Sequence, residues 1–231
     1  MDIEAVRREG KIMSDTAYRL DMTMMFAVHD ALRRDLMHIA RITARPTDDP
    51  KRVLSAAVGW ELFKTYLRVH HTAEDDAVWP VMQVALADRP DDLAVLDALE
   101  AEHALIDPIL AGVDAALSDI DFGHDRLGDL VDGLATTLSA HLKHEESEGL
   151  ALIDATVSPE QWKSFSDLHR NRIGADTHRY LPWLLDGANS RAAGLILGRI
   201  PEPLRTAYQN EWRLSYAVMN PWGIKVDPAT N

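Results

Sequence analysis

The sequence predicts an all-α protein, an up-down-up-down bundle of four long helices followed by additional short C-terminal helices. Three observations predict this fold. Apolar residues recur in alternating steps of three and four along four separate stretches, which is the spacing of one helix face. Alternating runs rich in β-branched residues are missing, so strands are not expected. Turn signals are far apart, and short connections between long helices favour antiparallel neighbours.

The first two predicted helices carry polar residues inside their apolar stripes. The first is expected over about residues 15–42 and has His29 on its stripe. The second follows the proline-rich turn after it and has His70 and Glu74 on its stripe. Pro80 lies in the same pattern, and because proline has no backbone N–H, it should kink or break the helix soon after these residues.

The third and fourth predicted helices repeat this feature. The third follows a break at residues 88–92 and has His103 on its stripe. The fourth follows a turn at residues 119–125 and has His141 and Glu145 on its stripe. Each helix therefore places an imidazole near the middle of its length or somewhat past it. An up-down-up-down bundle can bring such positions into one layer.

The last third of the chain has a different composition. It is rich in tryptophan, arginine and proline, and Ser158-Pro159 is a typical helix start, with a serine cap and proline in the first turn. We therefore expect two regions. Residues 1–157 should form the bundle, and residues 158–231 should form a helical C-terminal extension that packs on it.

Composition excludes several classes of function. The net charge of -13 argues against binding to nucleic acid or to anionic membranes. The chain has no cysteine, which excludes disulfides, thiolate catalysis and cysteine-based zinc or iron–sulfur sites. Neither a signal peptide nor an apolar run of about 18 residues is visible, so a cytoplasmic location is expected.

Six polar residues at stripe positions call for a common explanation, because burying polar groups is costly unless they find partners. The set is His29, His70, Glu74, His103, His141 and Glu145. Two of its pairs have i, i+4 spacing, which places an imidazole and a carboxylate on one helix face. These donors suit iron, manganese, zinc or copper, and two carboxylates can bridge a pair of metals about 3.5–4 Å apart. A metal-free network of histidines and glutamates is the alternative.

The same residues carry a resemblance to a known family. They are the isolated His29, the block from His70 to Pro80, the pair Glu102-His103, and the block from His141 to Glu146. In this order they resemble the hemerythrin-like, or HHE cation-binding, domain family, bacterial type, over about residues 15–155. The resemblance implies two iron ions, Fe2+ or Fe3+, with an oxo or hydroxo bridge. Zinc and manganese are less favoured.

By that resemblance, the donors divide between the two irons. His29 and His70 would hold one iron, and His103 and His141 the other. Glu74 and Glu145 would bridge them.

The chain departs from the respiratory hemerythrins at two positions. Asp107 stands where they carry a histidine one turn after the third-helix histidine. Glu146 occupies the position of their aspartate, although Glu145 lies better on the stripe. The family's iron-sensing members use the residue after the second-helix histidine, which is His71 here. His71 and Asp107 are therefore secondary ligand candidates.

These departures favour reaction with a small ligand over simple oxygen storage. The predicted function is a non-haem di-iron protein that binds or reacts with dioxygen, peroxide or nitric oxide. Peroxide- or nitric-oxide-processing activity is left open, and no catalytic residue is assigned. The alternatives are an iron or oxygen sensor and a structural zinc-binding bundle without turnover. Homodimer formation is also left open.

Overall fold

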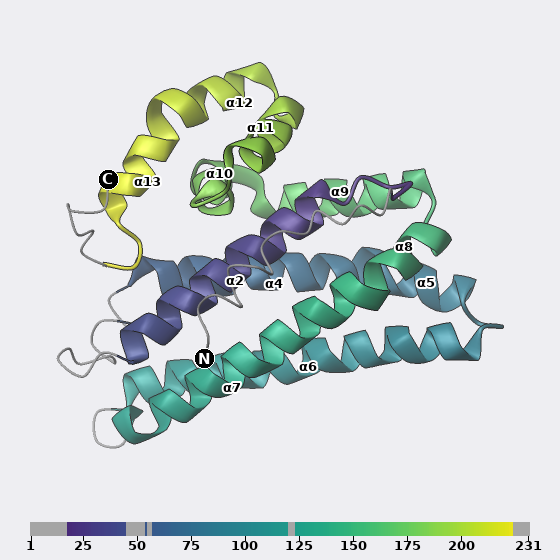
Figure 1. Ribbon diagram of the computed structural model, residues 1–231, viewed down its shortest axis with the longest axis horizontal. Coiled ribbons are helices and arrows are strands. Elements are labelled where there is room, and N and C mark those ends of the chain that lie inside the picture. Colours follow the sequence, from purple (N-terminus) through teal and green to yellow (C-terminus); the bar gives the residue numbers. More distant parts are fainter. Residues whose placement is uncertain (1–17, 45–53, 55–56, 120–122, 224–231) are drawn as a thin grey trace.

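The computed structural model describes residues 18–44, 54, 57–119 and 123–223, and the rest of the chain lies outside this description. The described residues form helices and no strands. Four long helical rods run side by side in alternating directions, and shorter helices follow at the C-terminal end (Figure 1). The prediction of an all-α bundle with additional C-terminal helices is therefore confirmed.

Each rod of the bundle corresponds to one predicted helix, although two of the rods are interrupted. The rods are α2 (Thr23–Thr43); α4 (Val58–Ala77) with α5 (Trp79–Ala85); α6 (Pro90–Ser118); and α7 (Gly123–His144) with the π-helical segment η1 (Glu145–Gly149) and α8 (Leu150–Thr156). The break between α4 and α5 lies at Val78, two residues before Pro80, as the sequence predicts. The interruption at η1 was not predicted.

The first helix starts later than predicted. Residues 15–17 lie outside the described residues, and Tyr18–Met22 precede α2 without being helical. Backbone N–H groups of Arg19 and Leu20 donate to the carboxylate of Asp154 on α8, at 3.0 Å and 2.6 Å. Because these donors are bound to α8, the segment is held across the end of the bundle and does not continue α2.

The apolar core is divided into two clusters. One contains Leu32, Leu67 and Leu138, and the other contains Met25 and Leu150. Along each rod, the polar stripe residues lie at or near the point where the residues of one cluster end and those of the other begin. The buried polar layer therefore crosses the bundle between two regions of ordinary hydrophobic packing.

The C-terminal helices cover one side of the bundle (Figure 1). They are α9 (Pro159–Ile173), the short 3-10 turn η2 (Gly174–Asp176), α10 (Thr177–Leu185), α11 (Ser190–Arg199), α12 (Glu202–Ala207), the π-helical segment η3 (Tyr208–Trp212) and α13 (Arg213–Met219). Ser158 and Gln161 form a capping box at the start of α9, as the Ser-Pro signal indicates. The division of the chain at residues 157 and 158 stays a prediction. Among the described helices, none combines the length and apolarity needed to cross a membrane.

Candidate metal centre

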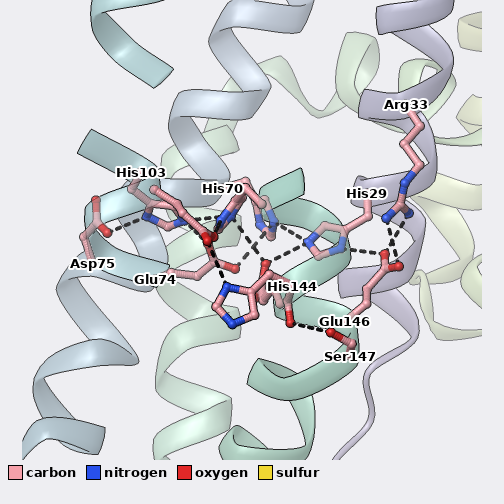
Figure 2. A network of polar contacts seen from close by, with 12 residues as sticks. His29, Arg33, His70, Glu74, Asp75, His103, His144, Glu146 and Ser147 are labelled. Carbon is pink, nitrogen blue, oxygen red and sulfur yellow. Dashed lines mark hydrogen bonds and ion pairs between the residues drawn. The ribbon is translucent and has the colours of Figure 1, made fainter. Parts of the chain in front are cut away.

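The structure brings all six predicted donors into one buried layer. The helix α2 supplies His29, α4 supplies His70 and Glu74, and α6 supplies His103, while His141 comes from α7 and Glu145 from η1. All six side chains are buried. Figure 2 shows part of the polar network that results, with the imidazole of His29 facing that of His70 across the middle of the bundle.

The four imidazoles form two pairs. Nε2 of His29 lies 3.0 Å from Nε2 of His70, and Nε2 of His103 lies 3.1 Å from Nε2 of His141. Two nitrogens bound to one first-row metal ion at about 2.1 Å and at right angles would lie about 3.0 Å apart. The separation within each pair therefore suits a shared cation.

Each glutamate spans the two pairs. An oxygen of Glu145 lies 3.2 Å from Nε2 of His29 and 3.7 Å from Nε2 of His141. The oxygens of Glu74 lie 3.4 Å from Nε2 of His70 and 3.6 Å from Nε2 of His103. Each carboxylate thus faces both pairs, which is the placement a bridging ligand needs.

Three of the imidazoles are oriented by carboxylates on their outer nitrogens. The contacts are Nδ1 of His29 with Glu146 at 2.9 Å, Nδ1 of His103 with Asp75 at 2.8 Å, and Nδ1 of His141 with Glu102 at 3.0 Å. An ionised carboxylate only accepts hydrogen bonds, so Nδ1 donates and a neutral ring presents the lone pair of Nε2 to the centre. This is the carboxylate–histidine arrangement that fixes metal ligands in proteins.

The geometry of these donors is suited to a bound cation. In their neutral forms, His103 and His141 each donate the Nδ1 proton to a carboxylate. Their two Nε2 lone pairs then face each other with no proton between them. The carboxylate oxygens of Glu74 and Glu145 are buried and make no hydrogen bond of good geometry to any described residue. Buried acceptors without donors are costly, and a cation would satisfy them together.

Comparison with known proteins agrees with this geometry. The family model for the hemerythrin HHE cation-binding domain matches residues 21–153, more than half of the chain. The chain belongs to the hemerythrin HHE family. It is also 23% identical over 201 residues to the zinc finger protein BRUTUS-like of Arabidopsis thaliana, covering 82% of this chain but only 16% of that protein's length. No solved structure matches the chain significantly.

Protonation in the metal-free HHE domain follows from the same contacts. Burial opposes the charge on His29, but the negative charges of Glu145 and Glu146, together with the hydrogen bond of Nδ1 to Glu146, outweigh burial and raise its pKa to about 9. Burial and the neighbouring charge of Glu145 raise the pKa of Glu74 well above its ordinary value. Burial and the nearby imidazoles lower the pKa of His70. Without metal, protons on His29 and Glu74 therefore balance part of the charge of the layer.

The two secondary candidates have different places in the HHE domain. His71 is buried, its ring stacks on that of His103 at 3.9 Å, and its ligating nitrogen lies within 4.8 Å of those of His103 and His141. A third imidazole thus joins this pair from α4. Asp107 is exposed and lies at the edge of a cavity that reaches His103. It does not converge with the buried donors.

Several supporting residues were not predicted. Glu102 and Asp75 adjoin predicted donors in the sequence, yet their role depends on a neighbouring helix, which the stripe pattern of a single helix does not show. His169 of α9, outside the matched HHE region, lies 6.2 Å from His70 between ring centroids in an edge-to-face arrangement. Burial and Arg172 lower its pKa to about 4, so the ring is neutral. No spacing rule connects a residue of the extension with the bundle core.

Proposed function

We propose that this chain is a non-haem di-iron protein that binds or reacts with a small ligand such as dioxygen, peroxide or nitric oxide. His29 and His70 would hold one iron, and His103 and His141, joined by His71, would hold the other. Glu74 and Glu145 would bridge the two. When bound, an iron pair supplies redox chemistry and coordination positions for such ligands.

The observation that carries this proposal is the orientation of the imidazoles. Carboxylates of Glu146, Asp75 and Glu102 hold three Nδ1 protons on the outside of the layer. The Nε2 atoms then face inward in pairs 3.0 Å and 3.1 Å apart. In the pair formed by His103 and His141, a metal-free network would instead place a donor against one of the two Nε2 acceptors.

The chain's own residues would control the chemistry in two ways. The bridging glutamates are fully buried, so water is kept from the middle of the layer. One of the outer carboxylates is held in turn, because Arg33 donates to both oxygens of Glu146, at 2.7 Å and 2.8 Å. Figure 2 shows this pair of residues. Support of this kind keeps the ligating rings oriented and increases their basicity.

Metal analysis coupled to an absorption spectrum tests the proposal. Protein purified from iron-supplemented cells should contain about two irons per chain and show near-ultraviolet charge-transfer bands. His103→Ala should lose at least one iron and most of that absorption, whereas His178→Ala, an exposed histidine of α10, should retain both. Zinc in place of iron, with no such bands, would favour the structural zinc-binding alternative. Loss of peroxide decomposition in His103→Ala but not in His178→Ala would identify turnover.

A sensor function is the second candidate, because the extension contacts the same helix as the donors. Arg172 of α9 donates to Thr72 at 3.0 Å and pairs with Asp76 on α4, and these two residues lie two positions before and two positions after Glu74. A change in metal occupancy could pass through these contacts to the extension. Limited proteolysis tests this idea, since a sensor should show much faster cleavage of residues 158–223 after metal removal. Equal cleavage rates would rule it out.

A further inference from the structure

A cavity lies beside the buried layer of imidazoles. It has a volume of about 280 Å³ and lies between α4, α5 and α6. His71, His103 and Trp79 form its buried floor. Its edge is exposed or half-buried and includes Asp75, Glu100 and Asp107, together with Arg68. The cavity thus leads from solvent to two imidazoles of the buried layer.

This cavity is also where the layer is most accessible. His71 and His103 are 7% and 8% exposed, while His29, His141 and the two bridging glutamates are 0% exposed. Among the six donors and His71, the two imidazoles at this floor are therefore the ones that solvent reaches most. With roughly 30 Å³ for each water, the cavity holds several waters, so an ion can enter partly hydrated.

The charges at the cavity edge favour cations. The edge carries three carboxylates and one guanidinium, and the chain as a whole is strongly acidic. Burial and the negative charges of Asp97 and Asp75 raise the pKa of Glu100, which indicates a negative local potential. A neutral ligand such as dioxygen would not respond to this potential, and an anion would be repelled.

The floor offers a ligand that lacks a partner. Nε2 of His71 is buried and makes no hydrogen bond to any part of the chain that the structure describes. It lies with the ligating nitrogens of His103 and His141, all within 4.8 Å of one another. A cation attracted to the edge of the cavity thus has an imidazole acceptor directly inside it.

We propose that this cavity is the loading port of the metal centre, where Glu100 and Asp107 capture a hydrated divalent cation and pass it to His71 and His103. The inference rests on the proposed function only in assuming that the buried layer binds cations. Asp75 is bonded to His103 and so belongs to the centre itself. In the part of the chain that the structure describes, the side chains of Glu100 and Asp107 form no hydrogen bond or ion pair with the six donors, so they can be changed separately.

The experiment measures the rate of metal uptake. Metal-free full-length protein is mixed with cobalt(II) chloride in a stopped-flow instrument, and visible absorption of the bound ion is followed. The double variant Glu100→Gln, Asp107→Asn should load about three- to tenfold more slowly at low salt, with the same final stoichiometry. Arg68→Gln should load about two- to threefold faster. Both differences should largely vanish at about 1 M salt.

The double variant Asp129→Asn, Asp132→Asn is the matched control, because it removes two exposed negative charges from α7, away from the cavity. It should load at close to the wild-type rate. If the wild type takes up cobalt and the Glu100 and Asp107 double variant and the Arg68 variant do so at the same rate, the loading port is overturned. It is also overturned if the control variant loads as slowly as the Glu100 and Asp107 double variant. A wild-type protein that binds no cobalt, iron or zinc would instead overturn the metal centre itself.

Discussion

At the scale of single residues, the centre depends on which nitrogen of each histidine carries its proton. Glu102 illustrates this point, because one oxygen accepts from His141 at 3.0 Å and the other accepts from His144 at 2.9 Å. His141 is fully buried, whereas His144 is partly exposed. Glu102 therefore fixes the orientation of a ligand candidate without entering the layer.

Glu102→Gln should weaken metal binding at the pair formed by His103 and His141. A glutamine can place an N–H toward Nδ1 of His141 and no longer stabilises the ring as a carboxylate does. We expect a loss of about 10- to 100-fold in affinity at this position. Competition with a chromogenic chelator measures it. His144→Gln, which alters only the outer side of Glu102, is the control, and equal effects in both variants would contradict this role.

The pH dependence of metal binding should follow His29. Its pKa of about 9 means that the metal-free ring is protonated at neutral pH, and a cation must displace that proton. Affinity should therefore fall by about tenfold for each unit of decreasing pH between about pH 8 and pH 6. The raised pKa of Glu74 adds to this slope. Cobalt(II) affinity across this range measures the effect, and an affinity independent of pH would exclude proton displacement.

At the scale of elements, the π-helical segment begins at the glutamate that enters the layer. Glu145 begins η1 and faces inward, while Glu146 turns outward to His29 and Arg33. Gly149 at the end of η1 has little free space, because a Cβ there would lie 2.9 Å from Leu99 and 3.1 Å from Cγ of Glu145. Interruptions of this kind are common at functional sites.

Gly149→Ala should therefore affect metal binding more than folding. The added methyl would push the stem of Glu145 by a few tenths of an ångström, and we expect about tenfold weaker binding. Alanine is favoured over glycine in a helix by about 1 kcal/mol, which offsets part of the crowding. Gly128→Ala on α7 is the matched control, since nothing lies within 4 Å of its Cβ position. It should bind metal as the wild type does.

At the scale of the whole molecule, the extension is joined to the bundle by a buried polar contact. Nε1 of Trp183 on α10 donates to the carboxylate of Asp35 on α2 at 2.6 Å, and both side chains are fully buried. Arg34 pairs with the other oxygen of Asp35 at 3.0 Å. Burial nevertheless raises the pKa of Asp35. The free energy of unfolding therefore depends on this contact between distant parts of the chain.

Trp183→Phe should lower the free energy of unfolding by about 1–3 kcal/mol, because it leaves a buried carboxylate oxygen without its donor. Urea unfolding of the metal-free protein measures the change. Asp35→Asn completes a double-mutant cycle that separates the hydrogen bond from the lost ring volume. Independent, additive effects of the two substitutions would show that the contact does not couple the extension to α2.

The sequence allowed the fold and the buried positions of the six candidate donors to be predicted. A stripe with steps of three and four belongs to a single helix, so His29, His70, His103 and His141 could be placed on inward faces one helix at a time. The same reasoning located the break near Pro80 and the start of α9 at Ser158. It gave no warning of η1, because nothing in the local spacing distinguishes a π turn from an α turn.

The sequence by itself determined which faces are apolar, which donors lie on them and that the chain belongs among helical bundles. Only the tertiary structure decided the partners across helices: Glu102 with His141, His71 with His103, and His169 beside His70. It also decided that an acidic cavity opens onto the layer between α4 and α6. The physical reason is that these contacts depend on the rotation and relative height of neighbouring helices. Packing of the whole core sets both, and the pattern of any one helix does not.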